Sequence, residues 1–65
     1  MRVKELENLL YSTARVRIYD SDDEFYSYLR YEGDTEYIPN IYKDRKIHSI
    51  DSGTTYIDII LEYDD

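Results

Sequence analysis

Residues 54–63, TTYIDIILEY, decide the fold because they form the most regular strand pattern in the chain. Alternate apolar positions are predicted to face the core, namely Ile57, Ile59 and Leu61. The positions between them are predicted to face outward, namely Tyr56, Asp58 and Glu62. Ile60 breaks this alternation. A strand with one apolar face needs neighbouring strands and a covering layer, so the rest of the chain must supply both.

Two further strands are predicted earlier in the chain, over residues 14–19 and 25–31. In the first of them, Val16 and Ile18 alternate with polar or aromatic side chains. The polar run 20–24 between the two strands is typical of a loop, so the pair is predicted to form a hairpin. The segment Glu32-Gly33-Asp34 is predicted to end the second strand.

The remaining segments give a helix, an ambiguous stretch and a weak strand. Residues 2–11 carry apolar side chains at helical spacing, which predicts an N-terminal helix. In residues 35–45, Pro39 suits the first turn of a short helix on which Ile38, Ile41 and Tyr42 share a face, and a loop is the alternative. A weak strand is predicted over 45–50, followed by a turn at 51–53.

The predicted fold class is therefore α+β, in one domain covering residues 1–65. The N-terminal helix packs on a small four-stranded antiparallel sheet, and a candidate short helix lies between the second and third strands. Short connections favour an antiparallel meander, and the helix must cover the apolar face of the sheet. A domain of this size buries only about 60% of its unfolded surface, so association with a partner or with a second copy is an open expectation.

Composition and charge restrict the classes of function. The 65 residues include 15 acids and 8 lysines or arginines, giving a net charge of −7. Such a charge repels nucleic-acid phosphates and anionic membranes and attracts basic surfaces, although it also serves solubility alone. There are no cysteines, and the N-terminus lacks the apolar segment of a signal peptide, so a cytoplasmic location is expected.

Nine of the residues are tyrosines, and they cannot all lie in the core. The predicted alternation places four of them on the outer face of the sheet, namely Tyr19, Tyr26, Tyr28 and Tyr56. Clustered exposed tyrosines are typical of protein interfaces, since they offer a large contact area at a low entropic cost. The alternative is that they are ordinary strand formers on a solvated face.

The negative charge is concentrated in residues 20–36, which hold seven acids and one base, Arg30. Carboxylates interleaved with aromatic side chains imitate the phosphates and bases of a nucleic acid, and the alternative is a solvated polar loop. The candidate partner-binding residues are Asp20, Asp22, Asp23, Glu24, Tyr26, Tyr28, Tyr31, Glu32, Asp34 and Glu36.

The residues give little indication of a catalytic site, a metal site or a cofactor site. The run Asp20-x-Asp22-x-Glu24 lacks the glycine and the glutamate that a calcium loop needs at its sixth and twelfth positions. His48 is the single histidine, and Ser49 points to the opposite face of a strand, which disfavours a catalytic triad. We therefore expect no enzyme activity, no metal and no cofactor.

The stretch VKELENLLYSTARVRIYD, together with IPNIYKDRKIHSI and TTYIDIILE, resembles short proteins encoded by phages and mobile elements of Gram-positive bacteria. Some small acidic phage proteins inhibit host defence, including anti-CRISPR proteins that block DNA binding. The resemblance implies an anti-defence inhibitor acting in the host cytoplasm. This chain departs from the simplest members in its tyrosine-rich, acidic segment 20–37.

Three hypotheses of function follow. The first is a phage-type inhibitor that mimics nucleic acid and binds a basic host protein, without binding nucleic acid or membranes itself. The second is an oligomeric module that sequesters a nucleotide signal, with tyrosines stacking on the base and cationic side chains holding phosphates: Arg15, Arg17, Arg30 or Lys43. The third is a structural or assembly protein.

Overall fold

The computed structural model describes residues 1–21 and 26–63 of the chain. The described elements, in chain order, are the helix α1 (Val3–Glu7), the strands β1 (Arg15–Ser21) and β2 (Ser27–Asp34), the 3-10 turns η1 (Thr35–Tyr37) and η2 (Asn40–Tyr42), and the strands β3 (Ile47–Ser52) and β4 (Ile57–Leu61). The order of helix and strands agrees with the α+β prediction.

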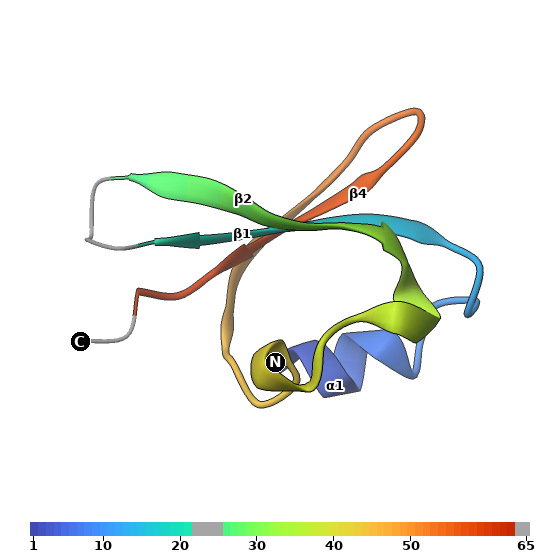
Figure 1. Cartoon of the computed structure of the whole chain (residues 1–65), viewed down its shortest axis with the longest axis horizontal. Coiled ribbons are helices and arrows are strands. Elements are labelled where there is room, and N and C mark those ends of the chain that lie inside the picture. Colours follow the sequence, from blue (N-terminus) through green and yellow to red (C-terminus); the bar gives the residue numbers. More distant parts are fainter. Residues whose placement is uncertain (22–25, 64–65) are drawn as a thin grey trace.

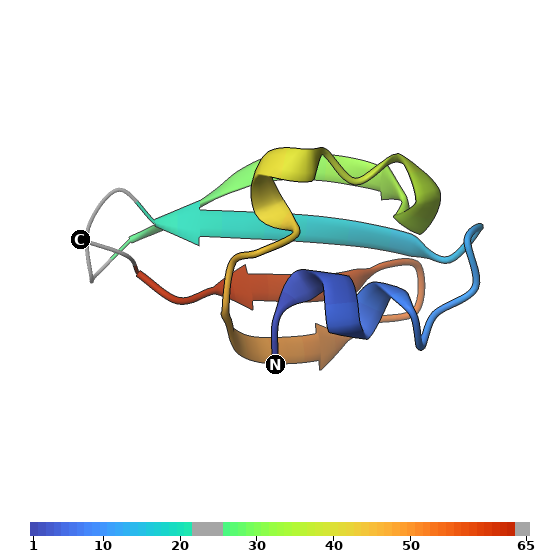
Figure 2. The ribbon, with the colours of Figure 1, turned by 90° about the horizontal axis from the view of Figure 1, so that it is seen from below.

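The four strands form one sheet in the order β2-β1-β4-β3 (Figure 2). β1 pairs with β2 and β3 pairs with β4 in antiparallel fashion, but the two central strands, β1 and β4, run parallel. The prediction of an antiparallel meander is therefore wrong, and the sheet is mixed. Its two hairpins lie side by side instead of following one another across the sheet.

Burial explains why β1 and β4 meet at the centre. These strands hold the side chains that are almost completely inaccessible, Val16 and Ile18 in β1 and Ile59 and Leu61 in β4. Central strands lose the most surface to their neighbours, so the most apolar strands gain the most there. Parallel neighbours need a long connection, and here the chain between them includes β2, both 3-10 turns and β3.

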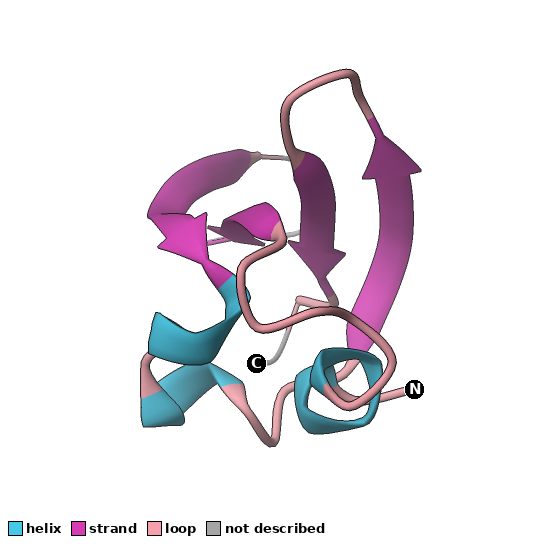
Figure 3. Cartoon of the chain, turned by 90° about the vertical axis from the view of Figure 1, so that its right-hand side faces the viewer, coloured by secondary structure: helices cyan, strands magenta, loops and turns pink. Residues whose placement is uncertain are grey.

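One face of the sheet is covered and the other is open (Figures 1 and 3). Figure 2 shows α1 lying across β4 and β3, while the segment with η1 and η2 lies across β1 and β2. Backbone hydrogen bonds join the two parts of the cover: the Val3 N–H donates to the Arg45 carbonyl at 3.1 Å and the Lys4 N–H to the Lys43 carbonyl at 3.0 Å.

The helical elements are shorter than predicted. The helix expected over 2–11 ends at Glu7, where the Leu9 N–H donates to the Leu6 carbonyl and tightens the chain into a 3-10 turn. The candidate short helix in 35–45 is replaced by two 3-10 turns, the second preceded by Pro39. The predicted shared face fails, because Ile38 is buried and Ile41 is 75% exposed.

Among the described residues, the core is small and consists of seven buried apolar side chains. They come from α1, from β1 and β4, and from the segment between η1 and η2: Val3, Leu6, Val16, Ile18, Ile38, Ile59 and Leu61. Thr35 is also buried, and its hydroxyl donates to the Ala14 carbonyl at 2.8 Å. This bond satisfies the buried hydroxyl of Thr35, the residue at which the segment with η1 and η2 begins.

Several segments predicted as loops belong to strands. Asp20 extends β1, residues 32–34 extend β2, and Asp51 lies in β3. Polar residues are tolerated in these strands because they lie in rows on the open face or at the ends of the sheet. The expected loop residues Asp22, Asp23 and Glu24 lie outside the described residues.

Candidate functional site

The candidate site predicted from the sequence is divided by the fold. Of its acids, Asp22, Asp23 and Glu24 lie outside the described residues. The other members are distributed along the β1–β2 hairpin and η1: Asp20, Tyr26, Tyr28, Tyr31, Glu32, Asp34 and Glu36. These seven positions differ strongly in exposure and in partners.

A β-bulge in the β1–β2 hairpin separates the tyrosines. The register shifts between Ile18 and Tyr19, so that Tyr19 pairs with Leu29 and Asp20 pairs with Tyr28. Since paired residues point to the same face of a sheet, Tyr28 lies on the face of Asp20 and Leu29 on the face of Tyr19. The predicted four-tyrosine outer face is therefore wrong for Tyr28.

Tyr31 lies at the margin of the core and not on a free surface. It is opposite Ile18 in the sheet and packs against the buried cluster. Its hydroxyl donates to the Asp34 carbonyl at 2.6 Å. Burial, together with the nearby charges of Asp34 and Glu36, raises the pKa of this phenol. Tyr31 thus supports the hairpin from inside.

The exposed part of the hairpin carries large side chains in β2, the edge strand, and at the residue just before it. Tyr26 is 63% exposed, Tyr28 48% and Leu29 47%. The guanidinium of Arg30 lies 5.6 Å from the centre of the Tyr28 ring, which orders both side chains. We call Tyr26, Tyr28 and Leu29 the hairpin surface. Glu32 and Glu36 are also exposed, while Asp34 is half-buried.

Asp20 is engaged by the fold. Its two carboxylate oxygens accept from Nη1 and Nη2 of Arg45 at 2.8 Å each, and both side chains are mostly buried. Arg45 also donates to the Glu62 carbonyl at 3.0 Å. This bidentate ion pair fastens the end of β1, next to the acidic segment, to the residues that precede β3 and follow β4.

Replacing Arg45 with methionine should lower the free energy of unfolding by roughly 1–3 kcal/mol, because the mostly buried Asp20 carboxylate loses its paired cation. Urea titration followed by circular dichroism measures the change. The matched control is Lys4→Met, which removes a cation from a pair with Asp44 at 2.9 Å in which both side chains are exposed. This control should change stability little. Equal effects of the two substitutions would contradict the assigned role of Arg45.

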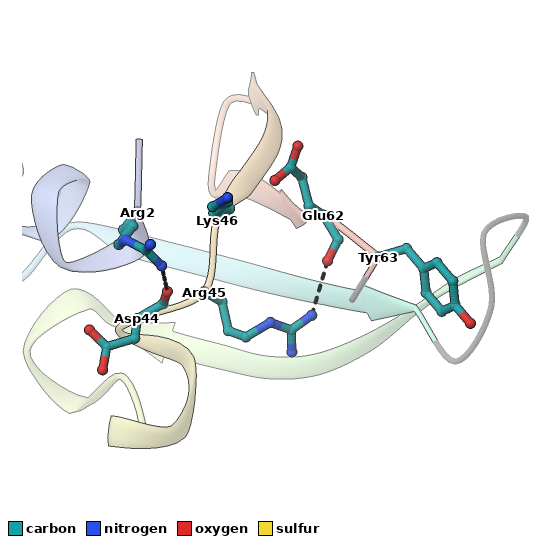
Figure 4. A pocket seen from close by; sticks show the side chains of 6 residues that line it. All are labelled: Arg2, Asp44, Arg45, Lys46, Glu62 and Tyr63. Atoms are coloured by element: carbon teal, nitrogen blue, oxygen red, sulfur yellow. Dashed lines mark hydrogen bonds between the residues drawn. The ribbon is translucent and has the colours of Figure 1, made fainter. Parts of the chain in front are cut away.

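The pocket beside this ion pair is lined mostly by charged side chains, which come from near both ends of the chain and from the residues just before β3 (Figure 4). It measures about 220 Å³ and is lined by Arg2, Asp44, Arg45, Lys46, Glu62 and Tyr63. Its guanidinium groups are used structurally, since Arg2 donates to the Asp44 carbonyl and Arg45 to the Glu62 carbonyl. Figure 4 shows the Asp44 and Glu62 carboxylates pointing away from Arg45. The two arginines of this pocket therefore join segments of the fold.

The open face of the sheet holds a row of charges that the sequence did not reveal. Arg17 pairs with Glu32 on β2 and with Asp58 on β4, and Asp58 pairs with Asp51 on β3. The Arg17–Glu32 ion pair measures 3.8 Å. The Arg17 guanidinium also lies 4.0 Å from the centre of the Tyr56 ring. The antiparallel β1–β2 pairing brings Glu32 beside Arg17, and the parallel pairing of β1 with β4 brings Asp58 beside it.

Neighbouring groups shift the pKa values of Arg17 and Tyr56. Burial lowers the pKa of Arg17, but Glu32, Tyr19 and Asp58 together raise it by more, so its pKa lies above the ordinary value. A hydrogen bond with Glu32 and burial raise the pKa of the Tyr56 phenol. Arg17 is thus a permanent cation held among carboxylates.

Within the described residues, no group of three or more histidine, aspartate or glutamate side chains is placed to hold a metal ion. None of the helices in the described part of the chain has the length and apolarity needed to cross a lipid bilayer. No protein-family model matches the chain, and no curated protein or solved structure matches it either.

Proposed function

We propose that this protein is a binding module that places its acidic, tyrosine-bearing hairpin on a basic surface of another protein. The observation that carries the proposal is the hairpin surface, where Tyr28 and Leu29 are exposed on opposite faces of the edge strand β2 and Tyr26 is exposed just before it. Exposed aromatic and aliphatic side chains along one edge of a sheet support an interaction site there. The acids that follow β1 in the sequence supply the charge that selects a basic partner.

The partner class follows from charge and from the resemblance to phage proteins. A net charge of −7 disfavours direct binding to nucleic acid. It favours the lysine- and arginine-rich grooves in which other proteins bind nucleic acid. We therefore propose an anti-CRISPR-like inhibitor that occupies such a groove of a host defence protein by mimicry of nucleic acid. Its action would be binding without catalysis, in the host cytoplasm.

The affinity experiment uses tagged protein as bait in a bacterial lysate at low salt. We expect it to capture a nucleic-acid-binding protein that is released both by a duplex DNA competitor and by high salt, because both displace charge-based contacts. Mass spectrometry identifies the captured protein. If captured proteins resist DNA competition, or none bind nucleic acid, the mimicry proposal fails.

Sequestration of a nucleotide signal receives less support from the geometry. Of the four cationic side chains expected to hold phosphates, Arg15 and Arg17 both lie beside the Tyr56 ring, whereas Arg30 and Lys43 lie elsewhere. Lys43 contacts Glu7 at 3.1 Å, Arg17 contacts Glu32, and Arg30 lies by Tyr28. A phosphate would meet neighbouring carboxylates at two of these three positions. We therefore prefer the protein-binding proposal.

A further inference from the structure

The outer edge of β3 is covered only where the strand begins. There the Ile47 N–H donates to the Met1 carbonyl at 2.9 Å, and Arg2 forms an antiparallel bridge with Lys46 beside this bond. β3 is the last strand in the sheet order, so no further strand of the described residues lies beside it after Ile47 (Figure 2). The fold thus uses backbone pairing at this edge and leaves most of the edge open.

The geometry of the β3–β4 hairpin shows which backbone groups point outward. The Gly53 N–H donates to the Tyr56 carbonyl at 2.9 Å, so the polar groups of Gly53 point toward β4. Hydrogen-bonded and non-hydrogen-bonded positions alternate along an antiparallel pair, so the backbone groups of Asp51 also point toward β4, and those of Ile50 and Ser52 point away. Within the described part of the chain, no partner on that side is found for them. Unpaired N–H and carbonyl groups along an edge are a template for another strand.

The side chains of β3 leave this edge accessible. Ile50 is opposite the core residue Ile59 and so faces the covered side of the sheet, yet it is 46% exposed because it lies at the edge. β3 contains no proline and no lysine, two residues that proteins use on edge strands to prevent pairing. The other edge strand, β2, contains the bulge and three charged side chains, namely Arg30, Glu32 and Asp34. Of the two edges, β3 is therefore the one suited to accept another strand.

The side chains of β3 complement those of a second β3 in one antiparallel register. With Ile50 opposite Ile50 of the second copy, the outward backbone groups exchange hydrogen bonds across a two-fold axis. Ser49 then lies opposite Asp51 of the second copy, where the hydroxyl donates to the carboxylate, and the axis repeats this pair. Ser52 lies opposite His48. A register with Ile50 opposite Ser52 would instead place Asp51 opposite Asp51, where like charges repel.

We propose that this protein forms a two-fold symmetric dimer in which the β3 strands of two copies pair antiparallel and join the two four-stranded sheets into one. The pairing covers Ile50 and supplies partners to the outward backbone groups of β3. A domain of this size has a small core, so such burial adds stabilisation that the single chain lacks.

The dimer is independent of the proposed function. β2 and β3 are the two opposite edges of the sheet, so pairing through β3 leaves the hairpin surface of each copy free. Failure to capture a basic partner would therefore not affect the dimer, and a monomeric protein would not affect the proposal for the hairpin.

The parent chain provides the first test. Sedimentation equilibrium from roughly 5 μM to 1 mM should show a monomer–dimer equilibrium with a dissociation constant of about 1–100 μM, as suits a small interface. Amide hydrogen exchange followed by NMR should be slower for Ile50 and Ser52 at the higher concentration, and unchanged for Thr54 and Thr55 in the β3–β4 loop. A monomer throughout this range would overturn the proposal, and so would a dimer without protection of Ile50 and Ser52.

Two substitutions of one residue test the register with opposite signs. Ser49→Asp places a carboxylate opposite Asp51 twice in the dimer and should weaken it at least about tenfold, whereas Ser49→Lys places an ammonium there and should tighten it roughly threefold to tenfold. Ser12→Asp and Ser12→Lys make the same changes of net charge at an exposed serine between α1 and β1, and they should alter the dissociation constant less than about twofold. Changes of the same sign in both Ser49 variants, or no larger than those in the Ser12 variants, would show that the copies associate through another surface. The measurements on the parent chain decide the proposal even if a variant fails to fold.

Discussion

Replacing Ile18 with alanine should lower the free energy of unfolding by about 2–5 kcal/mol. Ile18 is fully buried at the centre of the sheet, with Tyr31 beside it on β2 and Ile59 beside it on β4. A domain of this length has a total stability of roughly 3–10 kcal/mol. The substitution should therefore remove a large part of the total stability, so that a large fraction of the protein is unfolded in water without denaturant.

Urea and thermal denaturation followed by circular dichroism measure this effect. The matched control is Ile41→Ala, the same chemical change at a side chain that is 75% exposed. It should alter the free energy of unfolding by no more than about 0.5 kcal/mol. Similar losses in the two variants would show that Ile18 is not part of a packed core.

Reversing the charges of Asp22, Asp23 and Glu24 to lysine should weaken capture of the partner protein by at least about 100-fold. The three acids lie in the most acidic part of the sequence, between β1 and β2. The change replaces attraction by repulsion at three positions, and like charges across an interface cost several kcal/mol. Stability should remain close to that of the parent chain, because the core residues are untouched.

A second triple variant tests whether the position of the reversed charges matters when the change in net charge is the same. Asp44, Asp51 and Glu62 are exposed acids outside the β1–β2 hairpin, and their reversal changes the net charge by the same amount. This variant should retain capture to within about tenfold, since long-range charge alone acts mainly on the association rate. Equal loss in both variants would contradict the assignment of the acidic hairpin as the binding element.

Local patterns were sufficient to predict the helix and the four strands of this chain, but not their exact ends or the two 3-10 turns. The alternation of Val16 and Ile18, and that of Ile57, Ile59 and Leu61, predicted strands whose inward residues are the ones that form the core. The apolar spacing of Val3 and Leu6 predicted the helix that covers them. These features depend on the periodicity of side chains along a single segment, which the sequence contains.

The arrangement of those segments was not predictable in the same way. The bulge between Ile18 and Tyr19 adds one residue to β2 opposite β1, and this shift alone moves Tyr28 away from the face of Tyr19. The Asp20–Arg45 pair joins residues that are 25 positions apart. Neither the bulge nor this ion pair produces a recognisable pattern in the residues next to it in the sequence.

The sequence by itself determined the inward-facing residues of β1 and β4, the acidic character of residues 20–36 and the approximate positions of the strands, because each depends on neighbouring residues alone. The tertiary structure decided the parallel pairing of β1 with β4, and with it the meeting of Arg17, Tyr56 and Asp58. That pairing depends on which strands gain the most free energy from burial at the centre of the sheet, and this comparison involves all four strands together. Its outcome depends on the packing of the whole chain and cannot be read from any one segment.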